Sequence, residues 1–179
     1  MKMDAKQLRA GQGASIKGQV IKNEIYIILD NVLDTYNIGA IFRLADAVAA
    51  KRVIICGQSE TPPNHRIKKA SINTTEVMDW TYSETTVKAI KDLREEIPGI
   101  QIVGVELDER SVPYDKFEYK FPVALVVGHE SDGISKEVLE VCDGIVELPM
   151  FGINISLNVM VSLGIVLYKV IEVNKLRQI

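Results

Sequence analysis

The stretch from Gly144 to Val173 constrains the fold more than any other part of this sequence. Its first five residues are typical of a short buried strand, which Pro149 ends because proline cannot donate a hydrogen bond to a neighbouring strand. Apolar residues then cover residues 157–174 more widely than the single stripe of a surface helix, so we expect a helix buried on more than one side. Ser156 immediately precedes this helix and is a favourable N-cap.

Strand and helix patterns alternate along the rest of the chain. Continuous apolar runs predict buried strands at 25–29, 53–56, 100–105 and 122–127, with a weaker strand at 77–82. Helical patterns occur at 38–50, 85–96 and 136–141, with one further turn near 67–70. This order predicts an α/β fold with a mainly parallel sheet flanked by helices. Ligands of such sheets bind beyond the carboxyl ends of the strands.

The composition is that of an ordinary globular domain. The chain has 179 residues, of which 47% are hydrophobic and 25% are charged. We expect a single domain over residues 24–179, preceded by a basic arm or short helix over residues 1–23. No apolar run is long enough to span a bilayer and the first residues carry no apolar signal segment, which predicts no membrane partner and a cytoplasmic protein.

The two cysteines, Cys56 and Cys142, lie in or beside predicted buried elements. Neither is close to a histidine cluster, and His129 beside Glu130 has no second histidine at helical spacing. We therefore expect buried free thiols, no disulfide framework and no metal.

The net charge of −3 and the isoelectric point near 5.5 do not favour a nucleic-acid partner by themselves. Positive charge is nevertheless clustered in two places, which comprise Lys2, Lys6, Arg9, Lys17 and Lys22 in the arm, and His65, Arg66, Lys68 and Lys69 further on. The clusters permit an RNA partner without indicating one, and ordinary solvated surface is an equal alternative.

Three polar stretches follow predicted strands, and each carries a short motif. The motifs are Asn37-x-Gly-Ala-Ile-x-Arg43, Gly128-x-Glu-x-x-Gly133 and Leu148-Pro-Met-x-Gly-x-x-x-Ser-Leu-Asn158. The usual dinucleotide, phosphate-loop and serine-hydrolase fingerprints are absent. In the third motif Asn154, Ser156 and Asn158 lie at a strand-to-helix junction, where free backbone N–H groups attract polar or anionic ligands. The alternative is that these residues only cap the helix and shape a turn.

With all three motifs present and in order over about residues 25–172, the chain resembles the SpoU/TrmH family of RNA ribose 2′-O-methyltransferases, in the SPOUT class. The resemblance implies a C-terminal deep trefoil knot, which departs from the general rule that chains do not knot. It also implies a homodimer, which the strongly apolar last helix suits, and S-adenosylmethionine (SAM) as cofactor with S-adenosylhomocysteine as product.

The resemblance further implies which residues bind SAM. Gly128 and Gly133 would cradle the cofactor on one side, and the pocket would be completed by Leu148, Met150, Ser156 and Leu157 on the other side and by Val105 and Glu106 at a strand end. Backbone N–H and C=O groups would read the adenine, which accounts for the glycines and short side chains there.

Arg43 matches the family's catalytic arginine, and the resemblance places Asn37, Glu130, Ser156 and Asn158 around it. Two roles stay open for Arg43: the base that deprotonates the ribose hydroxyl, or a clamp on the neighbouring phosphate, held by Glu130 and Asn37. In the alternative interpretation, Arg43 has no catalytic role and forms a surface ion pair with Asp46 or Asp34. Asn37 could likewise be simply the N-cap of a helix that starts at residue 38.

The sequence thus predicts a SAM-dependent enzyme that methylates a ribose 2′-hydroxyl of tRNA or rRNA, with the RNA crossing a subunit boundary. Two alternatives stay open: a non-catalytic RNA-binding or scaffold protein that retains the knotted fold, and a SPOUT enzyme that methylates a base. Calorimetry with SAM and S-adenosylhomocysteine distinguishes the first alternative, and mass spectrometry of the digested product distinguishes the second.

Overall fold

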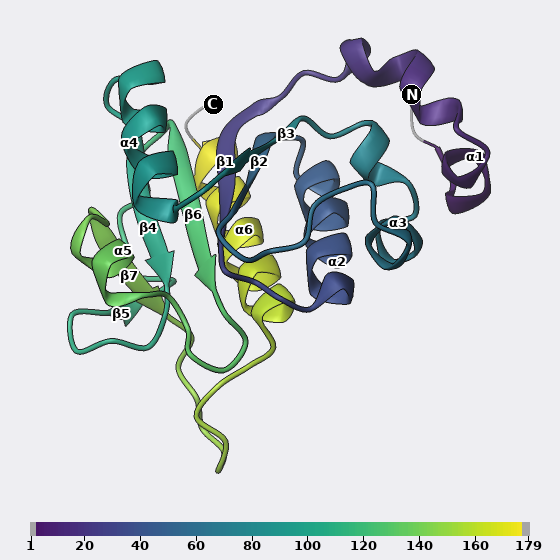
Figure 1. Ribbon diagram of the computed structural model, residues 1–179. Coiled ribbons are helices and arrows are strands. Elements are labelled where there is room, and N and C mark those ends of the chain that lie inside the picture. Colours follow the sequence, from purple (N-terminus) through teal and green to yellow (C-terminus); the bar gives the residue numbers. More distant parts are fainter. Residues whose placement is uncertain (1–2, 177–179) are drawn as a thin grey trace.

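The computed structural model describes residues 3–176 (Figure 1). Lys2, the first two residues of the expected arm (1–23) and the last three residues of the expected domain (24–179) lie outside the described residues. One seven-stranded sheet runs through the molecule in the order β3-β2-β1-β6-β4-β7-β5, and all its strand pairings are parallel. The strands are β1 Asn23–Asp30, β2 Ala50–Cys56, β3 Trp80–Ser83, β4 Gln101–Val105, β5 Val112–Pro113, β6 Val123–Gly128 and β7 Gly144–Glu147. The helices are α1 Ala5–Arg9, α2 Thr35–Ala47, α3 His65–Ser71, α4 Thr86–Glu96, α5 Lys136–Glu140 and α6 Val159–Leu176, with 3-10 helices η1 Gln12–Gln19 and η2 Thr74–Glu76.

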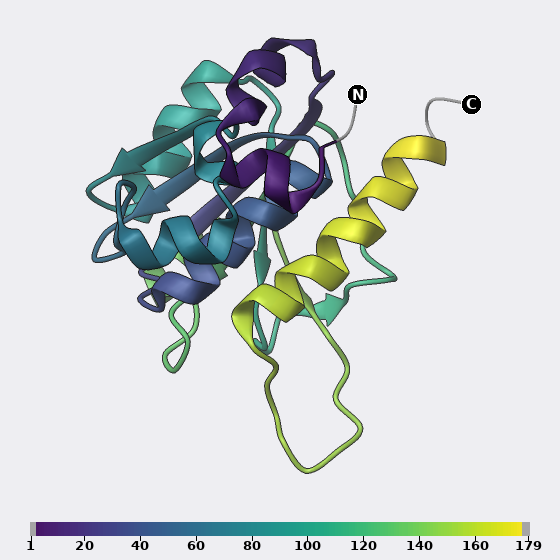
Figure 2. The same cartoon turned by 90° about the vertical axis from the view of Figure 1, so that its right-hand side faces the viewer.

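Helices cover both faces of the sheet, and the two faces form separate apolar cores. Alternate residues of β1 point to opposite sides: Ile27 belongs to the core under α2 and α6, whereas Ile28 belongs to the core under α4 and α5. Figures 1 and 2 show α2, α3 and α6 on one side and α4 and α5 on the other. The expected α/β fold with a mainly parallel sheet flanked by helices is confirmed.

Helix α2 starts earlier than the sequence predicted. The Asp34 side chain accepts a hydrogen bond of 2.7 Å from the Tyr36 N–H and so caps a helix that begins at Thr35. Asn37 lies buried inside the first turn, and the interpretation of Asn37 as the N-cap of a helix from residue 38 is wrong. Several good capping residues occur in a row here, and local sequence does not choose among them.

The start of α6 also differs from the prediction. Asn158 Oδ1 accepts hydrogen bonds from the N–H groups of Met160 (3.0 Å) and Val161 (3.4 Å), and it therefore caps the helix. Ser156 lies exposed in the preceding loop, where its own N–H donates to Asn154 Oδ1 at 3.3 Å. The prediction of Ser156 as N-cap is therefore wrong by two residues.

The basic arm packs against the rest of the molecule beside α3 (Figures 1 and 2). Asn73 Nδ2 donates to the carbonyl oxygens of Leu8 (3.2 Å) and Arg9 (3.3 Å), and Lys17 forms an ion pair of 2.7 Å with Asp79. The arm thus has a defined place and contains the short helix α1. No helix within residues 3–176 is long and apolar enough to cross a membrane.

Both cysteines are free thiols, as predicted. Cys56 is fully buried and Cys142 partly so. Burial raises the pKa of each thiol to about 12, so neither is a ready nucleophile.

Candidate functional site

A hollow of about 340 Å³ opens at the carboxyl edge of the sheet, where the segments after β4, β6 and β7 converge. Its lining includes all the residues that the resemblance assigned to the cofactor: Val105, Glu106, Gly128, Gly133, Leu148, Met150, Ser156 and Leu157. The structure therefore brings together in one place residues that are spread from position 105 to position 157 of the chain. Their role in binding SAM stays a prediction.

The first wall is the loop that follows β6. The backbones of His129 and Gly133 exchange two hydrogen bonds, of 3.0 and 2.9 Å, which close the loop on itself. Inside it, His129 Nδ1 accepts from the N–H groups of Ser131 (3.0 Å) and Asp132 (3.2 Å). A Cβ atom on Gly128 would lie 2.2 Å from the backbone carbon of Gly133, so no side chain fits at the base of this loop.

Glu106 ties this loop to β4. One of its carboxylate oxygens accepts from the Leu107 N–H at 2.9 Å and the other from the Ile134 N–H at 2.8 Å. Gly133 adopts a left-handed conformation with φ +69° directly against this carboxylate. Glu106 thus both lines the hollow and shapes its wall.

The second wall is the segment between β7 and α6. Residues 146–148, 150, 155–157, 159 and 162 contribute to it, with the apolar side chains of Leu148, Met150 and Leu157 among them. The tip of the loop, Phe151 and Ile153, points away from the core and is almost fully exposed. Figure 2 shows this loop extending beyond the body of the protein before the chain returns as α6.

A hydrogen-bond network joins the three motifs at the edge of the hollow. Glu130 accepts hydrogen bonds from the backbone N–H groups of Leu33 (3.1 Å) and Asp34 (2.9 Å) and from Asn37 Nδ2 (3.0 Å). Asn158 Nδ2 in turn donates to Asn37 Oδ1 at 3.1 Å. The loop after β6, the start of α2 and the start of α6 are therefore fixed relative to one another.

This network determines what Glu130 can do. Partial burial by itself would raise the pKa of the carboxyl group, but hydrogen bonds from Asn37 and from the Leu33 and Asp34 amides outweigh it and hold the pKa below its ordinary value. A carboxylate that is already engaged and weakly basic is a poor proton acceptor. Glu130 therefore anchors the start of α2, and its part in catalysis stays a prediction.

Arg43 lies outside the hollow of its own chain. It is exposed on α2, six residues beyond Asn37, which places it about 9 Å along the helix axis and on another face. Among residues 3–176 it makes no hydrogen bond or ion pair, so the expected grip by Glu130 and Asn37 does not exist within one chain. Its interpretation as a surface ion-pair partner of Asp46 or Asp34 is wrong for the same reason.

Two contributions to the site were not recognised in the sequence. His129 organises the loop after β6, and Asp30, at the end of β1, accepts a hydrogen bond from the Ser135 N–H just beyond that loop. An acidic residue ending an otherwise apolar strand was the available signal for Asp30. Within the described part of the chain no group of three or more His, Cys, Asp and Glu side chains could hold a metal ion.

The fold and the site define an α/β protein with a ligand-sized hollow built from three loops at the carboxyl edge of a parallel sheet. The chain belongs to the SpoU rRNA methylase family, whose model matches residues 24–168. It is 34% identical over 152 residues to the tRNA (guanosine(18)-2′-O)-methyltransferase of Aquifex aeolicus, covering 83% of this chain and 69% of the relative. It is 30% identical over 148 residues to the 23S rRNA (guanosine-2′-O-)-methyltransferase RlmB of Ralstonia nicotianae, covering 83% of this chain and 58% of the relative.

Solved structures give the same result. The AdoMet-bound rRNA methyltransferase from Sinorhizobium meliloti superposes with a TM-score of 0.75 at 29% identity, over 83% of this chain and 56% of that one. Several matched relatives are longer proteins, and the chain spans less than two thirds of their length. The family resemblance inferred from the three motifs is confirmed.

Proposed function

We propose that this protein transfers a methyl group from SAM to a ribose 2′-hydroxyl of tRNA or rRNA. The observation that carries the proposal is the hollow, because segments of the second and third motifs line it and the Glu130–Asn37–Asn158 network ties the first motif to its edge. The names of the Aquifex and Ralstonia relatives support ribose methylation, and the AdoMet-bound Sinorhizobium structure supports the cofactor.

The hollow suits SAM in size and in chemistry. Its volume of about 340 Å³ falls within the range of small-molecule sites. Leu148, Met150 and Leu157 offer apolar contact for an adenine ring, while the loop of residues 128–133 and Glu106, which also line the hollow, offer polar groups. When bound, SAM supplies an electrophilic methyl group on a sulfonium.

We assign Arg43 to the RNA phosphate beside the target ribose. A guanidinium stays protonated at ordinary pH and offers a fork that matches a phosphate. Arg43 is exposed and unpaired among the described residues, so no acid has to be displaced before a phosphate binds. Clamping this phosphate would align the neighbouring hydroxyl for attack.

The site becomes complete in a homodimer, which we propose as the active form. The solvent side of α6 exposes an apolar stripe of Val161, Ile165 and Tyr168, and α6 packs beside α2. A stripe of this kind is typical of a surface that a second copy covers. Since Arg43 lies outside the hollow of its own chain, the partner's α2 would bring its Arg43 to that hollow.

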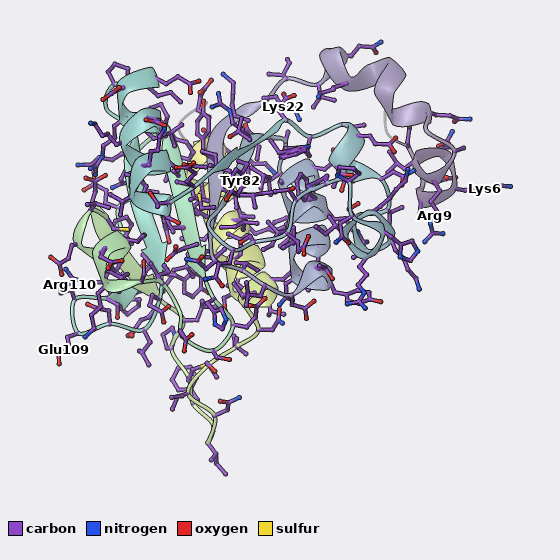
Figure 3. All side chains as sticks on the ribbon, in the orientation of Figure 1. Lys6, Arg9, Lys22, Tyr82, Glu109 and Arg110 are labelled. Carbon is purple, nitrogen blue, oxygen red and sulfur yellow. The ribbon has the colours of Figure 1, made fainter. Side chains whose placement is uncertain are left out.

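We propose that the RNA backbone docks on a basic face formed by α1 and α3. Lys6 and Arg9, labelled in Figure 3, lie on the arm beside α3, the helix that carries Arg66 and Lys69. None of the four forms an ion pair with a described residue. Unpaired cations on one surface are the electrostatic footprint of phosphate binding.

Three further expectations stay part of this proposal. They are the trefoil knot formed by the last loop and α6, a single domain over residues 24–179 with the preceding arm, and a cytoplasmic location, where tRNA and rRNA are found.

The proposal is tested by incubating the purified protein with isotopically labelled SAM and total RNA, then digesting the RNA and identifying the modified nucleoside. We expect a 2′-O-methyl nucleoside with wild-type protein, no product with Arg43→Ala, and similar SAM affinity for both by calorimetry. A methylated base would establish a base methyltransferase. If neither SAM nor S-adenosylhomocysteine binds, the protein is a non-catalytic RNA-binding or scaffold protein. Full activity in Arg43→Ala would overturn the role of Arg43.

A further inference from the structure

Asp30 is a buried carboxylate with no cation to balance it. It ends β1 in the middle of the sheet, in register with Gly128 of β6, and only 2% of its surface is exposed. No ion pair involves Asp30 within residues 3–176. Burying such a group is unfavourable unless hydrogen bonds satisfy its oxygens, so the surrounding residues must supply donors.

Three donors satisfy the Asp30 carboxylate. Oδ1 accepts hydrogen bonds from Thr86 Oγ1 at 2.6 Å and from Asn31 Nδ2 at 3.0 Å. Oδ2 accepts from the backbone N–H of Ser135 at 2.8 Å. One oxygen therefore faces the start of α4, and the other faces the chain that leaves the loop after β6.

The Ser135 contact is one half of a pair. The preceding amide, the Ile134 N–H, donates to Glu106 at 2.8 Å. Two carboxylates from two different strand ends thus hold two consecutive amides, directly after Gly133. Because residues 129–133 are closed by their own hydrogen bonds, these two carboxylates fix how the whole loop sits over the hollow.

We propose that Asp30 is a positioning residue of the cofactor site. It holds the 128–135 loop in its binding shape before SAM arrives, so that binding does not have to order the loop. Asp30 does not line the hollow and acts only through the Ser135 amide. This inference rests on the proposed function, since it concerns affinity for SAM.

Three variants test the role of Asp30. Asp30→Ala leaves the Ser135 N–H without its acceptor, and we expect SAM affinity to fall about tenfold or more while turnover at saturating SAM stays within about twofold. Asp30→Asn keeps one oxygen for Ser135 and can donate to the Thr86 hydroxyl, so we expect affinity within about threefold of wild type. Thr86→Val removes a different donor to the same carboxylate, one that does not belong to the loop after β6, and is the matched control: it should lower the melting temperature and leave SAM affinity unchanged.

Calorimetry with SAM, saturation kinetics and thermal melting distinguish the outcomes. If wild type binds SAM and Asp30→Ala binds equally well, or if Thr86→Val loses as much affinity, Asp30 is merely structural and the inference is wrong. A wild-type protein that binds no SAM would instead overturn the proposed function. If Asp30→Ala does not fold, amide hydrogen exchange on the wild-type protein without cofactor tests instead whether the loop is pre-formed. We expect slow exchange at Ile134 and Ser135, and rapid exchange there would overturn the pre-formed loop.

Discussion

Asn158 donates a hydrogen bond of 3.1 Å to Asn37, although the two residues lie 121 positions apart in the chain. Asn37 in turn donates a hydrogen bond of 3.0 Å to the Glu130 carboxylate. A small polar network therefore joins the first and the last motif of the sequence at the rim of the hollow, and the shape of the site depends on it.

Removal of the central member should disrupt this network. Asn37→Ala deletes the donor to Glu130 and the acceptor for Asn158; because both partners are exposed and can bind water instead, we expect a loss of about 1 kcal/mol. We expect a corresponding drop in the free energy of urea unfolding together with a large loss of methyl transfer. Asn174→Ala is a matched control, because it breaks a similar bond of 3.0 Å to Asn23 away from the hollow. It should lower stability only; equal loss of methyl transfer in both variants would contradict the role of Asn37.

The lowered pKa of Glu130 predicts how the stability of the protein depends on pH. Its folded-state pKa lies below the usual value of 4.5, so its stabilising contribution is fully present above that value and is lost as the pH falls through the folded-state pKa. Glu130→Gln, which cannot accept the same set of hydrogen bonds, should therefore be less stable than wild type at pH 7. The difference in unfolding free energy should shrink below about pH 4. A constant difference between pH 7 and pH 3 would argue against this assignment.

The loop after β6 should not tolerate a side chain at its base. Gly128→Ala would place a Cβ atom 2.2 Å from the Gly133 backbone, which cannot move without opening the loop. We expect SAM affinity, measured by calorimetry, to fall by about tenfold or more. Gly152→Ala, at the exposed tip of the loop between β7 and α6, is the control, since nothing lies within 4 Å of the added atom and affinity should be unchanged.

The basic face predicts a salt-dependent effect on RNA binding. Lys69→Glu should weaken RNA binding and lower the dependence of log affinity on log salt by roughly 0.7–0.9 for each phosphate that the protein no longer neutralises, with SAM affinity unchanged. Lys91→Glu makes the same charge change on α4, on the other side of the sheet, and should have a much smaller effect. Fluorescence anisotropy with labelled RNA at several salt concentrations measures both. Equal effects would mean that net charge alone matters.

The apolar stripe on α6 predicts a homodimer. Ile165→Glu should yield monomers by sedimentation velocity and abolish methyl transfer, whereas Ile21→Glu, at a residue that is 93% exposed in the segment before β1, should remain dimeric.

Mixing Arg43→Ala with Gly128→Ala, at a SAM concentration too low for Gly128→Ala to be active, tests whether the site is shared. If the partner supplies Arg43, random dimers of Arg43→Ala and Gly128→Ala chains contain about one quarter intact sites, and about that fraction of the activity should return. If subunit exchange is verified and no activity returns, the Arg43 that serves each site comes from the same chain as the hollow.

The sequence located the strands well because the strands of a parallel sheet are buried on both faces. Runs such as 25–29 have few other structural options, and β1 differs from the prediction only at its ends. Helix starts were less predictable. Asp34 and Asn37 are both good caps, and Asp34 was selected by a long-range contact, the binding of its own amide by Glu130.

Local patterns revealed which residues cluster at the hollow but not how they interact. The motifs identified Glu130 and Asn37 as site residues. They did not reveal that these two residues bind each other and not Arg43, because that depends on how close α2 lies to the loop after β6. Asp30 was overlooked because its partners, Thr86 and Ser135, come from elements 56 and 105 residues further along the chain. Contacts over such separations leave no periodic signal.

The second wall of the hollow and the cap of α6 both come from the last third of the chain. On the ribosome, the earlier two motifs emerge first and must wait for residues 146–162 before the cavity has a second side. We therefore expect nascent chains that stop short of this segment to capture no cofactor, so that competence for methylation arises only after residues 146–162 have been synthesised.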